Sequence, residues 1–198
     1  MAIIAPLSKP ARSAPMAADP LSDAGAPDFT DPLGMLVACH RRLERQLATL
    51  DRLQRHLPEF GSDTDARAAA RAILKYFDSA APNHHADEEA SLFPRLVALA
   101  PPQVELAIAE LENDHLELNR GWRRLRPQLA GIVAGVRSTL SPAEVERMRA
   151  AYSRHIAREE SDVFPLAARV LDGPALAAIG REMATRRGVD AESLPRRR

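Results

Sequence analysis

Residues 84–94 read HHADEEASLFP, residues 155–165 read HIAREESDVFP, and this pair of stretches decides the fold. Six of the eleven aligned positions are identical: one His, one Ala, two Glu, one Phe and one Pro. A more distant histidine precedes each stretch, His40 in the first half of the chain and His115 in the second. The sequence therefore predicts two related helix pairs, each with the pattern His … His-x-x-x-Glu.

The spacing within each stretch points to metal binding. Residues four apart on a helix lie one above the other on the same face, so a His-x-x-x-Glu pair presents both side chains together. An imidazole offers one nitrogen to one ion, whereas a carboxylate has two oxygens and can bridge two ions. The predicted metal ligands are His40, His84, Glu88, His115, His155 and Glu159. This set would hold two ions and leave coordination positions free.

A histidine on an apolar helix face is more often a hydrogen-bonded core residue than a metal ligand. Here, however, four of the six histidines lie on inward stripes, one on each predicted helix. Two glutamates at matching offsets share these stripes, and a buried glutamate is costly unless it is paired or bound to a cation. The coincidence favours a metal site.

The repeat also chooses between two overlapping pairs in the first half, where His85 and Glu89 have the same spacing as His84 and Glu88. The counterpart of His85 in the second half is Ile156, which cannot bind a metal. We therefore expect His85, Glu89 and Glu160 to lie at the periphery of the site. Glu44, one turn after His40, is a candidate acceptor for an imidazole N–H.

Apolar residues recur at helical spacing through most of the chain, and no strand-type alternation of useful length interrupts them. Helix starts are signalled by Asp31-Pro32 and Ser141-Pro142. Pro82 should kink the second helix, which we expect to end at Phe93-Pro94. Four long helices with short connections predict an all-α, up-down-up-down four-helix bundle. Their approximate ranges are 32–57, 62–92, 104–136 and 142–166.

The remaining segments and the composition set limits on the function. We predict a disordered tail at 1–30, the bundle at 31–172, and a short helix (about 174–187) with a basic tail at 173–198. The 27 basic and 27 acidic residues balance, which argues against a nucleic-acid partner. A single cysteine, Cys39, excludes an intramolecular disulfide. Without a 20-residue apolar run or a signal peptide, we expect a cytoplasmic protein with no membrane contact.

The pattern resembles the hemerythrin family, specifically its HHE cation-binding branch. The resemblance covers about residues 32–170 and is carried by two segments of the form His-x-x-x-Glu-Glu-x-x-(Leu/Val)-Phe-Pro, each preceded by a distal histidine. It implies two iron ions in an oxo- or hydroxo-bridged di-iron centre that binds dioxygen or a related small molecule. Ferritin-like bundles match less well, because they use Glu-x-x-His in a carboxylate-rich site.

The chain departs from the oxygen-carrying members of that family at Asn119, where they have a second histidine one turn after that of the third helix. Their last helix also uses His-x-x-x-x-Asp, where this chain has His155-x-x-x-Glu159. The centre should then be one imidazole short, and His85, Tyr152 or water could fill the position. An open centre suits sensing or reactivity better than reversible transport.

Three functions remain open from the sequence. The leading hypothesis is a binding or sensing protein for a small diatomic ligand or peroxide, with no catalytic residue and no cofactor besides the two iron ions. The second is a di-iron enzyme for peroxide or nitric oxide handling or for oxidation. The third is an iron-handling or structural metal bundle.

Overall fold

The computed structural model describes residues 28–99 and 101–190, and all the regular structure in these ranges is helical. The predicted all-α class is confirmed. Most of the tail predicted at 1–30 and the basic end at 196–198 lie outside the described residues. In the described ranges, no helix is long and apolar enough to cross a membrane.

The first long helix, α1, spans Pro32–Phe60 and starts where the sequence predicts. Asp31 caps it by accepting a hydrogen bond from the Gly34 backbone N–H at 3.1 Å, and proline occupies the first position, where no N–H is needed. Gly61 follows with a φ of 61°, a left-handed conformation that glycine adopts without strain, and it ends the helix.

The second long segment consists of three α-helices joined by π-helical turns. These elements are α2 (Thr64–Lys75), η1 (Tyr76–Ala80), α3 (Ala81–Asp87), η2 (Glu88–Leu92) and α4 (Phe93–Leu99). The expected end at Phe93-Pro94 is wrong, because the helix continues to Leu99. In η2 the Phe93 N–H bonds the Glu88 carbonyl five residues back, and this wider turn accommodates Pro94, which has no N–H to donate.

The second half of the chain likewise has one long helix followed by a segment with a π-helical turn, and then one further helix, α8. Its elements are α5 (Gln103–Ala134), α6 (Pro142–Arg158), η3 (Glu159–Val163), α7 (Phe164–Val170) and α8 (Gly173–Arg186). Ser141 caps α6, as predicted, by accepting from the Glu144 N–H at 3.4 Å. The π turns η2 and η3 begin at the equivalent residues Glu88 and Glu159, so the sequence repeat is also a repeat in backbone geometry.

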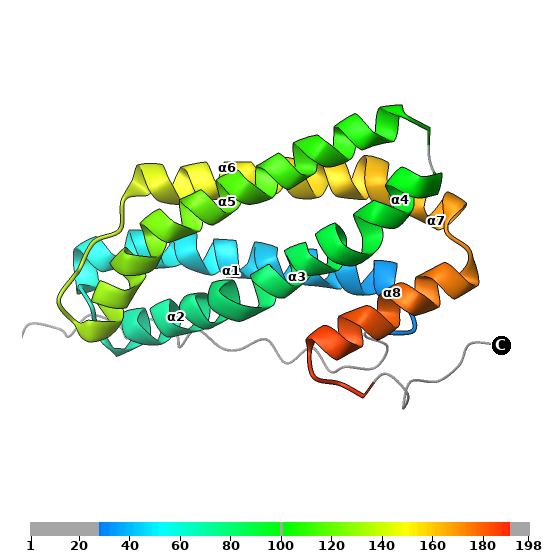
Figure 1. Cartoon of the computed structure of the whole chain (residues 1–198). Coiled ribbons are helices and arrows are strands. Elements are labelled where there is room, and N and C mark those ends of the chain that lie inside the picture. The colour runs from blue at the N-terminus through cyan, green and yellow to red at the C-terminus, as the bar shows by residue number, and fades with distance from the viewer. Residues whose placement is uncertain (1–27, 100, 191–198) are drawn as a thin grey trace, which may run out of the picture.

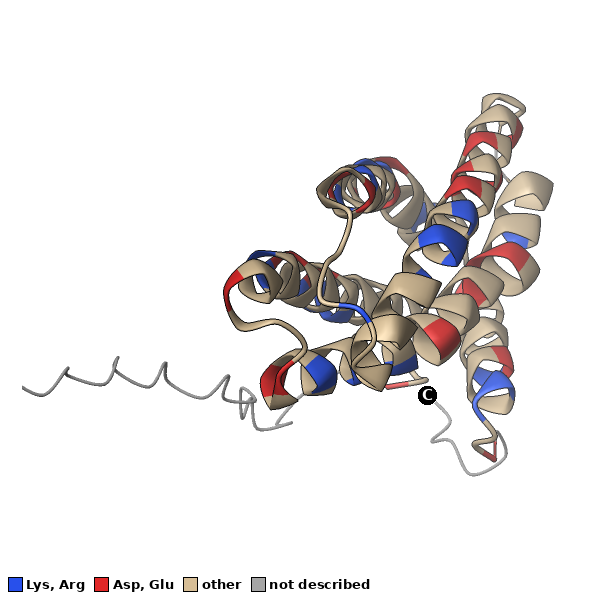
Figure 2. Ribbon diagram, turned by 90° about the vertical axis from the view of Figure 1, so that its left-hand side faces the viewer, with Lys and Arg blue, Asp and Glu red and all other residues tan. Residues whose placement is uncertain are grey.

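The long segments pack side by side as a bundle in which α2 and α6 each contact both α1 and α5, and α8 lies across one end (Figure 1). Basic and acidic residues are interspersed along the helices on the side shown in Figure 2, in keeping with the balanced charge.

The bundle core is divided along its length. One apolar cluster extends from Leu43 to Leu57 on α1 and includes Leu118 on α5, whereas the other includes Leu36 and Leu111 on the same two helices. His40 and His115 lie between the clusters in sequence and are 0% and 1% exposed. A buried polar layer therefore separates two hydrophobic cores.

Gly180 on α8 offers a direct test of how this helix docks. A Cβ atom at this position would lie 1.9 Å from the backbone carbonyl oxygen of Phe29. We expect Gly180→Ala to lower the free energy of unfolding by about 1–3 kcal/mol, because the backbone must shift. Gly173→Ala is the matched control, since nothing lies within 4 Å of a Cβ there. Chemical denaturation measures both, and equal stability of the two variants would contradict the docking described.

Candidate metal centre

Each long segment of the bundle places one histidine in the polar layer. His40 comes from α1, His84 from α3, His115 from α5 and His155 from α6, and all four are at most 1% exposed. Glu88 and Glu159, the first residues of the two π turns, are fully buried beside them. The structure thus brings all six of the predicted ligand residues into one cluster.

The two glutamates join histidines from different helices. The Oε1 and Oε2 atoms of Glu88 lie 3.3 Å from Nε2 of His84 and 3.4 Å from Nε2 of His115. For Glu159, Oε2 lies 3.0 Å from Nε2 of His40 and 3.3 Å from Nε2 of His155. Each carboxylate therefore has a histidine of its own half and one of the other half within reach.

Three groups of ligand atoms, each within 4.8 Å of one another, overlap in this layer. His40 and His84 form one group with both glutamates, and His115 and His155 form a second with the same two glutamates. The third group consists of His85, His115 and His155. Two of the groups therefore share Glu88 and Glu159, and two of them share His115 and His155.

Several buried polar atoms of the cluster have no hydrogen-bond partner, and in this respect the residues fit a metal site. Among the described residues, both oxygens of Glu88 and of Glu159 are buried without a hydrogen-bond partner. So are Nε2 of His40 and both ring nitrogens of His84 and His85. These atoms lie near one another without hydrogen-bonding geometry, and each unsatisfied buried group costs about 1–3 kcal/mol. Metal ions bound at about 2.0–2.2 Å would give the oxygens and one nitrogen of each ring a partner.

The electrostatics of the layer favour cations. Burial raises the pKa of Glu88 well above its usual value, and the charges of Glu159 and Asp87 add to the effect. Burial lowers the pKa of His84 and His85 well below the usual range, and that of His155 to about 4. These imidazoles are therefore neutral near pH 7, which is the form that binds metal.

The two halves also support each other through residues just outside the cluster. Nδ1 of His40 is 2.8 Å from Oε1 of Glu160, and Nδ1 of His115 is 2.6 Å from Oε1 of Glu89. The expectation that Glu44 would be the acceptor for His40 is wrong, because Glu44 pairs with Arg41. An Nδ1–H donated to a carboxylate leaves Nε2 free for a metal.

The same crossed pattern explains the phenylalanine of the repeat. Phe164 stacks on His40 with ring centroids 5.4 Å apart, and Phe93 stacks on His115 at 6.1 Å. Each repeat therefore supplies a carboxylate and an aromatic ring that orient the distal histidine of the other half. Glu89 and Glu160 lie beside the cluster, in agreement with their expected peripheral position.

His85 differs from the expectation of a peripheral residue. It is 5% exposed, and its ring stacks on His115 with centroids 4.0 Å apart and an angle of 11°. The adjacent His84 meets His40 instead, at 4.8 Å. Both neighbours can face the interior because α3 lies between α1 and α5. The repeat comparison missed this because it compares residue types and does not reveal which helices flank a position.

Asn119, where the fifth imidazole is missing, and Tyr152, a candidate to replace it, have different surroundings. Asn119 is exposed, because the residue of that turn which faces the core is Leu118. Tyr152 is buried with its ring centroid 6.3 Å from that of His85, among the core residues of the larger apolar cluster.

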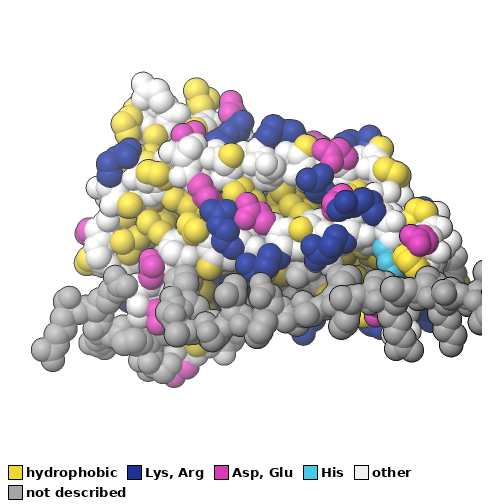
Figure 3. Space-filling model, turned by 180° about the vertical axis from the view of Figure 1, so that it is seen from behind, with side chains coloured by type: hydrophobic (Ala, Val, Ile, Leu, Met, Phe, Trp, Pro, Cys, Tyr) yellow, Lys and Arg dark blue, Asp and Glu magenta, His cyan; other side chains and the backbone are white. Residues whose placement is uncertain are grey.

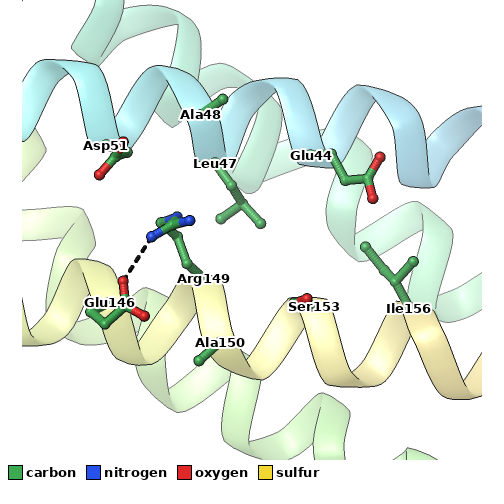
Figure 4. Close-up of a pocket in the computed structure, with 9 residues that line it drawn as sticks. All are labelled: Glu44, Leu47, Ala48, Asp51, Glu146, Arg149, Ala150, Ser153 and Ile156. Atoms are coloured by element: carbon green, nitrogen blue, oxygen red, sulfur yellow. Dashed lines mark hydrogen bonds and ion pairs between the residues drawn. The ribbon is translucent and has the colours of Figure 1, made fainter.

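An open groove of about 440 Å³ lies between α1 and α6 on the far side of the molecule from the view in Figure 1. Figure 3 shows hydrophobic side chains exposed there among charged ones. At one end of the groove lie Glu44 and Ile156, and Leu47 projects between the two helices (Figure 4). Ile156 directly follows His155, so this end of the groove lies beside the histidine layer.

A family model for the hemerythrin HHE cation-binding domain matches residues 31–167. The chain belongs to this family. It is also 36% identical to an uncharacterised protein of Haemophilus influenzae over 161 residues, which cover 81% of this chain and 92% of that protein. The resemblance drawn from the two repeated segments is therefore confirmed, and the hemerythrin HHE family supports cation binding at the buried His and Glu cluster.

Glu88→Gln should stabilise the metal-free protein and weaken metal binding. The pKa of Glu88 is raised in the folded state above the ordinary value of about 4.5 that it has in the unfolded chain. Between these two pKa values the folded chain therefore binds more protons than the unfolded chain. The free energy of unfolding of the wild type then falls as pH rises through this window. The variant keeps its stability there, because glutamine does not ionise. A gain of about 1 kcal/mol would raise Tm by about 2–4 °C. Thermal melts with a chelator at pH 5 and pH 8 measure this, and a gain that does not grow with pH would contradict it.

His85→Ala should weaken one ion site and spare the other. His85 lies near only the group that contains His115 and His155, whereas Glu88 belongs to both ion positions. Titration with ferrous iron should show one weakened site in His85→Ala and two in Glu88→Ala. His56→Ala is the matched control, because His56 pairs with Asp63 outside the layer. Two unchanged sites in His85→Ala would exclude His85 as a ligand.

Proposed function

We propose that this protein binds two iron ions in the buried layer and uses them to bind or sense dioxygen or a related small molecule such as nitric oxide or peroxide. The observation that carries the proposal is the sharing of Glu88 and Glu159 between two groups of ligand atoms. Imidazole and carboxylate together suit Fe(II), with Zn(II) and Mn(II) as competing occupants. When bound, the iron pair supplies coordination positions and electrons for a small ligand.

The two ions would have unequal surroundings. One is next to three imidazoles, those of His85, His115 and His155, and the other is next to two, those of His40 and His84. In the repeat, the residue equivalent to His85 is Ile156, which offers no ligand atom. An ion held by His40 and His84 would therefore have the open position, on the side where the repeat places Ile156.

The groove between α1 and α6 gives this side an approach from solvent. Ile156 lines the groove and is 5% exposed, and Leu47 forms another apolar part of its wall. A small uncharged molecule passes an apolar wall at little cost, whereas a charged one must lose its hydration. Charged residues also line the groove (Glu44, Asp51, Glu146 and Arg149), so this preference applies only where Ile156 and Leu47 form the wall.

Two further points belong to this proposal. The up-down-up-down order of the four long helices lets each half present its histidines to the other, as the shared carboxylates require. A single cysteine and the balanced net charge support a cytoplasmic protein that acts without nucleic acid or membrane partners.

The enzyme hypothesis rested on the missing imidazole at Asn119. If His85 supplied that imidazole, one ion would be better surrounded while the other kept an open position, so an enzyme stays the alternative to binding or sensing.

Iron analysis and spectroscopy of the reduced protein test the proposal. We expect about two iron ions per chain and a visible charge-transfer band on exposure to oxygen or nitric oxide that reverses when the gas is removed. Irreversible bleaching with consumption of peroxide would favour the enzyme. Clearly fewer than two ions per chain after iron-supplemented expression would refute the di-iron proposal.

Ile156→His is the sharpest variant, because it would give the second half the imidazole that the first half has in His85. We expect it to retain two iron ions and to lose most of the spectral response to nitric oxide. Ile156→Val keeps the apolar wall and should respond as the wild type does. A full response in the histidine variant would mean that the open position lies elsewhere.

A further inference from the structure

The C-terminal helix reaches the metal layer through a fully buried carboxylate. Asp87 directly precedes Glu88 and is 0% exposed. Arg187, at the end of α8, donates two hydrogen bonds to it, from Nη2 to Oδ2 at 2.6 Å and from Nη1 to Oδ1 at 3.1 Å. Arg186 also donates to Oδ1. Among the described residues, the recorded side-chain partners of Asp87 thus come from the C-terminal end of α8.

The contact continues along the π turn η2. Nη2 of Arg186 donates to Oγ of Ser91 at 3.2 Å, and Ser91 is fully buried. Arg95 donates to the Ser91 carbonyl at 2.6 Å and pairs with Glu182 of α8 at 2.7 Å. α8 is therefore attached at the start and at the end of the turn that Glu88 begins.

The repeat shows that this attachment is not part of the symmetric metal architecture. The position equivalent to Asp87 in the second half is Arg158, which is 38% exposed at its side chain and lies 3.3 Å from Glu110. The position equivalent to Ser91 is Asp162, which is exposed. α8 itself lies beyond residues 31–167, the part of the chain that the family model matches.

Apolar packing alone would dock α8 without the desolvation cost of a buried ion pair. Ile179 and Met183 are 0% exposed in the core beside α1 and η2, and they hold the helix in place without any charge. A buried ion pair of this kind adds little net stability, but a buried carboxylate without its partner is strongly unfavourable. Asp87 and the two arginines therefore make the position of the metal-bearing turn depend on α8.

We propose that Arg186 and Arg187 are positioning residues for the metal centre. By binding Asp87 they fix the turn that carries His84, His85 and Glu88, and they offset a negative charge next to the buried glutamates. Docking of α8 then determines how firmly the ions are retained. The inference rests on the proposed function only for the presence of the ions.

The test compares release of ferrous iron from the loaded full-length protein to a chelator. We expect Arg186→Gln/Arg187→Gln to release iron about tenfold faster than the wild type, the lower end of the range for residues that support metal ligands. Arg181→Gln, an exposed position on α8, is the control and should release iron at the wild-type rate.

Hydrogen exchange of the metal-free protein separates positioning from general destabilisation. Positioning predicts faster amide exchange at residues 84–92 in the double variant, with exchange at 155–163 unchanged. Equal acceleration in both segments would show a merely structural role and overturn the proposal.

If the double variant folds poorly, adding Asp87→Asn removes the unpaired charge, and this triple variant should fold and still release iron faster than the wild type. Release at the wild-type rate from either folded variant overturns the proposal. A wild-type protein that holds fewer than two iron ions would instead refute the proposed function, so the two failures can be told apart.

Discussion

Glu88 and Glu159 are buried together at the centre of the bundle, and the negative charge of Glu159 disfavours the ionised form of Glu88. An arrangement of this kind is unfavourable unless cations lie between the carboxylates. His84 and His155 beside them supply lone pairs and no compensating charge, since burial lowers the pKa of both imidazoles and keeps them neutral. At a pH where both carboxylates are ionised, bound cations would therefore let the polar layer stabilise the fold instead of opposing it.

The layer also ties the two halves of the chain into one unit. His40 of the first half is oriented by Glu160 and Phe164 of the second, and His115 of the second half by Glu89 of the first. Because every distal histidine takes its supports from the other half, neither helix pair could orient its ligands alone. The Glu-Glu and Phe-Pro parts of the repeat thus have a physical role that spacing by itself does not reveal.

The sequence predicted the all-α class, the start of α1 at Pro32 and the cap of α6 at Ser141, because these features depend on local periodicity and capping. It also predicted the six residues that the structure brings together, although their binding of metal stays a prediction. It could not predict the π turns, since Glu88–Leu92 has no composition that distinguishes it from an α-helix. The inward position of His85 was missed for a related reason, because it depends on which helices flank α3 and not on the residue itself.

The two halves differ at positions that would make two bound ions unequal. Where the first half has His85, the second has Ile156, and where the first has Asp87 bound to α8, the second has the surface residue Arg158. Both differences add interactions to the first half, one more imidazole and one more helix. The apolar side chain of the second half faces the groove between α1 and α6. In such a centre, the ion with an unfilled coordination position could bind a small ligand while the other ion kept all its protein ligands. A fully symmetric repeat would give both ions the same number of ligands and could not separate the two roles.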